Sequence, residues 1–272
     1  MKWGKFVAAG LSLALGFAAT AGIPVLAAAA DCHGHWAEKQ VDSFVEKGYT
    51  ALHGDSTFKP DESITQGEFI DEVNKAFALA GASALKAGNT YGTVTRAEAA
   101  GIISGLLKPD VQGDAAALNK FKDAAEIPEA YKGALGVFLA RKLIAGYTDG
   151  TLRPLKAISR AEAVTLLYRS LQSGLAEAGT YEGYLIDRHC FDKGDPEKES
   201  KMCLQMKMCA ESGYGLAIKQ PDGKFVFYPF DGNGQKLSED LLKKSENEGA
   251  FKLSVEGKPG IDGIKVSAIR EK

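Results

Sequence analysis

The sequence has 272 residues, of which 45% are hydrophobic and 25% are charged, with a formal net charge of −2. This length suits about two domains of ordinary globular composition. A net charge so close to zero argues against a nucleic-acid partner or any other strongly charged one.

The N-terminus, residues 1–30, is predicted to be a secretory signal peptide. Lys2 and Lys5 precede an apolar stretch over residues 6–26, and small residues follow it. This order is typical of an export signal with an A-x-A site, which places the cut just before Asp31. An N-terminal membrane anchor is the alternative interpretation. Because no later segment has the roughly 18 apolar residues that a span needs, we expect an exported protein without a membrane span.

Three similar segments follow along the first half of the chain. They read ITQGEFI, VTRAEAA and ISRAEAV, and they begin at Ile64, Val94 and Ile158. In each segment a Ser or Thr is followed three residues later by Glu, which is the pattern of a capping box at a helix start. Each segment is therefore predicted to begin a helix. Capping does not require the arginines that recur as Arg96 and Arg160.

The similarity extends upstream in the first and third copies. DSTFKP at residues 55–60 corresponds to DGTLRP at residues 149–154, and apolar residues with helical spacing precede both loops. Each of these units is therefore predicted to be a helix, a turn-rich loop and a capped helix. The second copy keeps a capped helix over residues 95–107 but lacks the loop, so its first helix is expected to be short or lost.

These motifs resemble the S-layer homology domain. The residues that carry the resemblance are GHWAEKQV at 34–41, GYTDGTLRP at 146–154, and the helix starts TRAEA and SRAEA. The resemblance covers residues 31–172 and implies an all-α bundle of three repeats with pseudo-threefold symmetry, the second repeat being truncated. The expected repeats span about residues 31–80, 81–108 and 119–172.

The resemblance also implies a function. Proteins of this family are held non-covalently on the secondary polysaccharide of a bacterial cell wall, often through its pyruvylated sugar, in grooves between the repeats. The matching groove residues in this chain are Trp36, Arg96, Asp149, Gly150 and Arg160. A guanidinium suits the carboxylate of a ketal pyruvate, and an indole suits the face of a sugar. The alternatives are solvated arginines at helix starts and a packed core tryptophan.

The chain departs from the family pattern in every unit. Gln66 and Gly67 stand where the family has Arg-Ala, the second unit lacks its loop, and residues 128–131 replace the His-Trp pair in the third unit. We therefore expect one or two working grooves.

The hydrophobic pattern changes in the second half of the chain, after a predicted linker at residues 173–179. Apolar alternation and a Pro-Asp-Gly turn predict five short strands and a helix over residues 236–245. The predicted strands are at residues 180–186, 214–218, 224–230, 251–257 and 263–269. Residues 180–272 are thus predicted to form a small α+β domain, for which a barrel of the OB type is one possible arrangement.

Three of the four cysteines fall in this domain, and the fourth is Cys32. On a single helix over KMCLQMKMC, residues 201–209, Cys203 and Cys209 would face different sides, so we expect a disulfide from Cys190 to one of them. The alternative is a soft-metal (copper) or thiol redox site that uses Cys190, Cys203, Met206 and Cys209.

The opening of the second half, GYLIDRHC, is similar to small exported bacterial domains that begin G-[YW]-[IL]-x-D-x-x-C and have no established activity. The sequence contains no G-x-S-x-G, H-E-x-x-H or phosphate-loop motif. We therefore predict a non-enzymatic surface protein without a cofactor, and leave the activity of residues 180–272 open.

Overall fold

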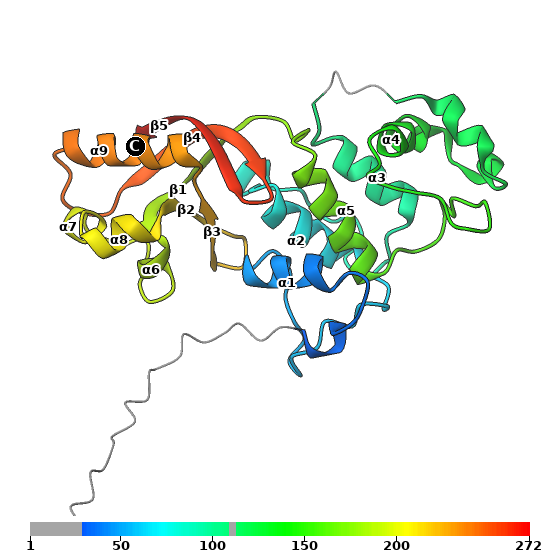
Figure 1. The fold of residues 1–272 in the computed structure, drawn as a ribbon, viewed down its shortest axis with the longest axis horizontal. Coiled ribbons are helices and arrows are strands. Elements are labelled where there is room, and N and C mark those ends of the chain that lie inside the picture. Colours follow the sequence, from blue (N-terminus) through cyan, green and yellow to red (C-terminus); the bar gives the residue numbers. More distant parts are fainter. Residues whose placement is uncertain (1–28, 109–112) are drawn as a thin grey trace, which may run out of the picture.

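A computed structural model describes residues 29–108 and 113–272 of the chain. The predicted signal peptide lies outside the described residues except for its last two positions. The two halves lie side by side along the long axis of the molecule (Figure 1). Helices α3 and α4 occupy one end, and α7 and α8 the other. No helix of the described part has the length and apolar character to cross a membrane.

The first half is helical, as predicted. Its five α-helices are α1 Glu38–Glu46, α2 Gln66–Ala76, α3 Arg96–Ser104, α4 Glu129–Ala140 and α5 Arg160–Gln172. Four short 3₁₀ helices lie between them at η1 Ala30–Cys32, η2 Gly81–Ser83, η3 Ala115–Lys120 and η4 Ala124–Glu126. The segment between α2 and α3 contains only η2, so the second unit has no counterpart of α1 or α4.

All three predicted capping boxes are present. The hydroxyls of Thr65, Thr95 and Ser159 accept hydrogen bonds from the backbone N–H three residues on, and the Glu at that position accepts from the backbone N–H of the cap residue. Satisfying these donors is why α2, α3 and α5 begin where they do.

Backbone bridges also join the segments at the three capped helix starts to one another. Single antiparallel bridges join Ser63 to Ser159, Thr65 to Thr93 and Thr95 to Ala157. Each unit is thereby paired with both of the others, which places the three segments around a common centre. The repeated heptapeptides therefore form a pseudo-threefold hub from which α2, α3 and α5 project.

The second half is an α+β domain whose strands match the predicted positions closely. The strands are β1 Gly179–Asp187, β2 Tyr214–Lys219, β3 Phe225–Pro229, β4 Lys252–Gly260 and β5 Gly263–Glu271. They form one antiparallel sheet in the order β3-β2-β1-β4-β5. Helix α9, Gly232–Lys244, connects β3 to β4.

The sheet is open, so a closed barrel is not confirmed. Its two edge strands approach each other at one place only, where a parallel bridge joins Phe230, just after β3, to Ile264 of β5.

Residues 201–209 do not form the single helix on which the expected directions of Cys203 and Cys209 were based. The chain forms two separate short helices there, α7 Lys201–Leu204 and α8 Lys207–Ser212, with Met206 in extended conformation between them. A third short helix, α6 Arg188–Phe191, follows β1 directly. The break after Leu204 changes the direction of the second cysteine-bearing segment, which matters for the site described below.

The two halves share one hydrophobic core, and the predicted linker is not a free connector. Ala176 is fully buried and bridges to Leu107, and the Lys108 N–H donates to the Leu175 carbonyl at 2.9 Å. Across the interface the rings of Tyr49 and Tyr228 stack with centroids 5.8 Å apart. The two halves are therefore packed together rather than tethered.

Candidate functional site

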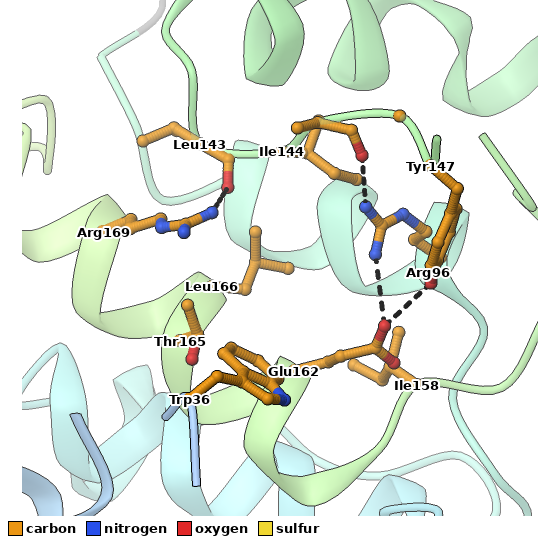
Figure 2. Close-up of a pocket in the computed structure, with 12 residues that line it drawn as sticks. Trp36, Arg96, Leu143, Ile144, Tyr147, Ile158, Glu162, Thr165, Leu166 and Arg169 are labelled. Carbon is orange, nitrogen blue, oxygen red and sulfur yellow. Dashed lines mark hydrogen bonds and ion pairs between the residues drawn. The ribbon is translucent and has the colours of Figure 1, made fainter. Parts of the chain in front are cut away.

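Arg96 is the first residue of α3 and reaches from the second unit toward the third. Its Nη2 donates to the Ala145 carbonyl at 2.7 Å, and its Nη1 lies 3.6 Å from Oε1 of Glu162 (Figure 2). Its Nε is buried and has no hydrogen-bond partner. Burial lowers the pKa of Arg96, but guanidinium groups have so high a pKa that the charge remains. The side chain is thus a charged group with one unused N–H.

A cavity of about 170 Å³ lies beside this guanidinium. Arg96 and Arg169 approach it from opposite sides, and Leu166 lies between them (Figure 2). The indole of Trp36 lines the cavity while 60% exposed, and the Thr165 hydroxyl in the wall is buried without a partner. The structure therefore brings Arg96 and Trp36 together, as the resemblance implied. It contradicts both a solvated Arg96 and a core Trp36.

The charge around the cavity is mainly positive. Glu162 is the one carboxylate that lines it, and the Tyr147 hydroxyl donates to that carboxylate at 2.8 Å. Arg153 lies over the Tyr147 ring, with its guanidinium carbon 4.0 Å from the centroid, and Lys156 lies 3.9 Å from Glu162. The four basic side chains outnumber the acidic ones here, although the whole chain is slightly acidic.

Sequence reasoning missed three residues of this site, Tyr147, Glu162 and Arg169. Glu162 was assigned only a capping role, which it also has. Tyr147 stands within the GYTDGTLRP motif, so its position in that loop was the available signal. Arg169 lies in the last turn of α5, far from any motif, and nothing in the sequence pointed to it.

Arg160 occupies the equivalent position at the interface of the third and first units, but its surroundings are closed. Its Nε donates to the Phe58 carbonyl at 2.7 Å, its Nη1 to Glu68 at 2.8 Å and its Nη2 to the Ala51 carbonyl at 3.1 Å. The residue is only 4% exposed. All three nitrogens are therefore occupied, and the structure places Arg160 in a structural contact outside the Arg96 cavity. The solvated interpretation is wrong for Arg160 as well.

Asp149 and Gly150 shape the adjacent loop and do not line the cavity. Asp149 accepts from the backbone N–H and hydroxyl of Thr151 and pairs with Arg153 at 2.7 Å. These hydrogen bonds hold the pKa of Asp149 well below its usual range. Gly150 has a φ of +83°, a conformation that glycine adopts without strain. A ligand contact for either residue stays a prediction.

The interface of the first and second units differs again. Gln66 stands at the arginine position, and its side-chain oxygen accepts from the Asn89 N–H at 2.6 Å. The hollow beside it is lined by Glu98 and Tyr131, and its lining contains no Lys or Arg among the described residues. Within the described part of the chain, only the interface at Arg96 places an arginine and an exposed aromatic ring at the same cavity.

The three cysteines of the second half converge. The Cys190 Sγ lies 3.4 Å from that of Cys203 and 3.6 Å from that of Cys209, and the last two sulfurs are 3.9 Å apart. These are not bond lengths, so the structure does not contain the expected disulfide of Cys190 with Cys203 or Cys209. Either pairing stays a prediction. Met206 is half exposed and lies between the two cysteine-bearing helices.

The thiols of Cys190 and Cys203 are not activated as nucleophiles. Burial is the main cause that raises the pKa of Cys190 well above its usual range. A hydrogen bond with Glu199, followed by burial, raises the pKa of Cys203 to about 11. Catalytic and redox-active cysteines have lowered pKa values instead. Cys32 is separate from this cluster and lies fully buried in the core.

Comparison with known families explains the repeats. Residues 31–70 and 120–164 match the S-layer homology domain. The first and third units are therefore similar to S-layer homology domains. The match includes Trp36, Asp149, Gly150 and Arg160, whereas Arg96 lies in the truncated second unit, outside both matched segments. The S-layer homology match assigns the chain to the bacterial cell surface.

Two relatives from Acetivibrio thermocellus are similar to parts of the chain. Cell surface glycoprotein 1 is 27% identical over 140 residues, which are 52% of this chain and 5% of that protein. A cellulosome-anchoring protein is 39% identical over 46 residues, which are 17% of this chain and 10% of that protein. The chain thus matches only a small part of each relative, 5% and 10% of their lengths.

Proposed function

We propose that this protein is anchored non-covalently to the secondary polysaccharide of a bacterial cell wall, and that the Arg96 cavity is the binding site. The observation that carries the proposal is the cavity itself, which is lined by the guanidinium groups of Arg96 and Arg169 and by the exposed indole of Trp36. The name of the cellulosome-anchoring relative agrees with an anchoring role. The role is structural rather than enzymatic.

The chemistry of the cavity favours an anionic sugar. A carboxylate in the cavity would meet the positive charge of Arg96 on one wall and that of Arg169 on the opposite wall. The indole of Trp36 offers a flat face at the opening against which a sugar ring can stack. A pyruvylated sugar supplies both groups. The cavity is smaller than the 300–1,000 Å³ of most ligand sites, which suits one sugar unit of a longer polymer.

A single working groove is proposed. Arg160 already uses its three guanidinium nitrogens, and the Gln66 interface has no cation to bind a carboxylate. Asp149 would contribute indirectly, because it holds Arg153 against Tyr147 at the edge of the cavity. The second half, residues 180–272, is displayed by this anchor.

For the displayed domain we propose an open barrel of the OB type. The strand order, the position of α9 between β3 and β4, and the parallel bridge of Phe230 to Ile264 support this arrangement. The bridge falls between the two edge strands, at the place where such a barrel closes.

Sedimentation with purified cell-wall sacculi tests the anchoring. The chain from Asp31 onward should sediment with intact sacculi and stay in solution once the non-peptidoglycan polymer has been stripped. Arg96→Lys should weaken binding about tenfold, since Lys keeps the charge but loses the planar fork.

Arg141→Gln provides the matched control for this measurement. Arg141 is exposed in the third unit and does not line the cavity, so its loss removes one positive charge without changing the site. It should leave binding unchanged. Equal sedimentation with stripped and intact sacculi would refute the proposed ligand, and equal binding by the Arg96 and Arg141 variants would refute the proposed site.

A further inference from the structure

The three clustered cysteines come from three different short helices. Cys190 lies in α6, Cys203 in α7 and Cys209 in α8, and each is the third residue of its helix. The helices lie together at the end of the molecule opposite α4, far from the Arg96 cavity (Figure 1). The cluster is therefore a separate feature that the anchoring function does not use.

A short sequence pattern accompanies this placement. The helices begin RHC, KMC and KMC, so each cysteine follows a basic residue and then a histidine or methionine. The caps of the first two helices fix their cysteines, because Asp187 accepts from the Cys190 N–H at 3.0 Å and Ser200 from the Cys203 N–H at 3.3 Å. Three different segments are thus built to bring one thiol each to the same point.

A hydrogen-bond network ties the third helix to the first. The Ser212 hydroxyl lies 2.9 Å from Asp187 Oδ1 and 2.8 Å from the Cys209 carbonyl. Asp187 is fully buried, so this link between α6 and α8 is held at the base of the cluster. The thiols are consequently positioned by the surrounding fold before any ligand binds, which lowers the cost of ordering them around one.

The sulfur separations fit a single metal ion. Three thiolates about 2.3 Å from one ion are about 3.8 Å apart in tetrahedral directions and about 4.0 Å apart in a trigonal plane. The observed separations of 3.4, 3.6 and 3.9 Å are a few tenths of an ångström or less from this range, so a small outward shift of the sulfurs would admit one ion. The three residues also form the one group of metal-binding side chains found within the described part of the chain.

We propose that Cys190, Cys203 and Cys209 bind one Cu(I) ion. Binding replaces the S–H protons with the metal and changes no oxidation state. The donor set selects this ion, because soft sulfur ligands favour Cu(I). Structural Zn²⁺ sites, by contrast, almost always have four protein ligands. Glu199 hydrogen-bonds with Cys203, but no His, Asp or Glu of the described residues groups with all three thiols.

The methionines around the cluster point to the same ion. Met202, Met206 and Met208 are 75%, 50% and 55% exposed, and all three lie on or between α7 and α8. Large apolar side chains are seldom exposed in such number within seven residues. Thioethers are weak, soft donors that discriminate in favour of Cu(I), so this surface supplies an entry path for the ion toward the thiols.

Competition with a Cu(I) chelator tests the site. The chain from Asp31 onward, reduced and kept free of oxygen, is titrated against the Cu(I)–bathocuproine disulfonate complex. It should withdraw one Cu(I) per chain. Cys190→Ser, Cys203→Ser and Cys209→Ser should each weaken binding by more than the 10–100-fold that loss of an outer-shell partner costs. Cys32→Ala, a cysteine variant remote from the cluster, should bind like the wild type.

A measurement on the unmodified protein guards against variants that fail to fold. X-ray absorption of the Cu(I) complex should show three sulfur neighbours and no nitrogen or oxygen. Two sulfurs, or mixed ligands, would overturn the proposal. So would a reduced chain that loses Cu(I) to the chelator as readily as the cysteine variants do, including one that retains Zn²⁺ instead.

Discussion

Arg96 and Arg160 occupy equivalent positions in two repeats, yet their side chains have different hydrogen-bond partners and surroundings. Arg160 is buried and bonded to Glu68 and to two backbone carbonyls, whereas Arg96 keeps one nitrogen unpaired beside a cavity. Breaking a buried ion pair by removing one partner typically costs 3–5 kcal/mol. The side chain of Glu68 is 41% exposed, so screening by solvent makes the cost of breaking this ion pair smaller.

The two arginines should therefore separate stability from binding. We expect Arg160→Ala to lower the free energy of unfolding by about 2–3 kcal/mol, and Arg96→Ala to lower it by less while abolishing wall binding. Urea denaturation followed by circular dichroism, together with sacculus sedimentation, measures both effects. Equal destabilisation by the two variants would contradict the assignment of Arg160 to structure and Arg96 to ligand.

A single buried carboxyl should make the stability of the helical half depend on pH. Glu72 in α2 is 3% exposed and accepts from the Thr50 hydroxyl, and burial raises its pKa from 4.5 to about 8. The native state then binds a proton that the unfolded chain releases above pH 4.5. Stability from this group is present below pH 4.5 and is lost progressively as pH rises toward 8.

Replacing Glu72 with Gln removes that titration. The variant should be more stable than the wild type at pH 8.5, by a few kcal/mol at most, and should lose the decline between about pH 5 and 8. Thermal unfolding at pH 5, 7 and 8.5 provides the comparison. If the wild type and the Gln variant show parallel pH profiles, Glu72 is not the responsible group.

At the scale of single elements, the capping boxes set where three helices begin. Helix α3 is the most dependent on its cap, because it has nine residues and its unit lacks the second helix found in the others. Thr95→Ala removes the acceptor for the Glu98 N–H and should cost about 1 kcal/mol. Thr95→Ser keeps a hydroxyl and should cost much less. Chemical denaturation of the two variants measures the difference, and an equal loss would mean that the cap is not the cause.

The elements also show how far local sequence signals extend. Capping boxes, strand alternation and the Pro-Asp-Gly turn depend on neighbouring residues, so the helix starts at Thr65, Thr95 and Ser159 and all five strands were predictable. The break between α7 and α8 was not, because KMCLQMKMC carries no proline or glycine to signal it. The convergence of the three thiols depends on that break, and the sequence indicated it only through the alternative of a soft-metal or thiol redox site.

At the scale of the whole molecule, nonlocal contacts determine which side chains and segments are buried, and the sequence did not reveal this. Arg96 and Arg160 look alike in TRAEA and SRAEA, and only the tertiary surroundings show that one faces a cavity and the other a carbonyl of Phe58. The segment at residues 173–179 looks like a linker because it is small and polar, yet Ala176 packs into the shared core. Composition alone does not reveal which short segments a neighbouring domain will bury.

The shared core joins the helical half of the molecule to the sheet. Tyr228 of β3 is 1% exposed, stacks on Tyr49 of the helical half, and donates its hydroxyl hydrogen to the Lys75 carbonyl at 2.6 Å. One continuous cluster of buried residues spans both halves, so we expect the wild-type chain to unfold in a single calorimetric transition. Tyr228→Phe keeps the stacking and loses one hydrogen bond, which should cost about 1 kcal/mol.

Tyr228→Ala removes the ring as well and should cost about 3–5 kcal/mol, the usual loss for a large aromatic side chain in a core. Because the lost contact lies between the halves, we expect the single transition to broaden or divide in two, with the halves melting separately. Tyr91→Ala serves as the control, since Tyr91 is 91% exposed and should change neither the melting temperature nor the shape of the transition. Two transitions already present in the wild type would show that the interface does not couple the anchor to the domain it displays.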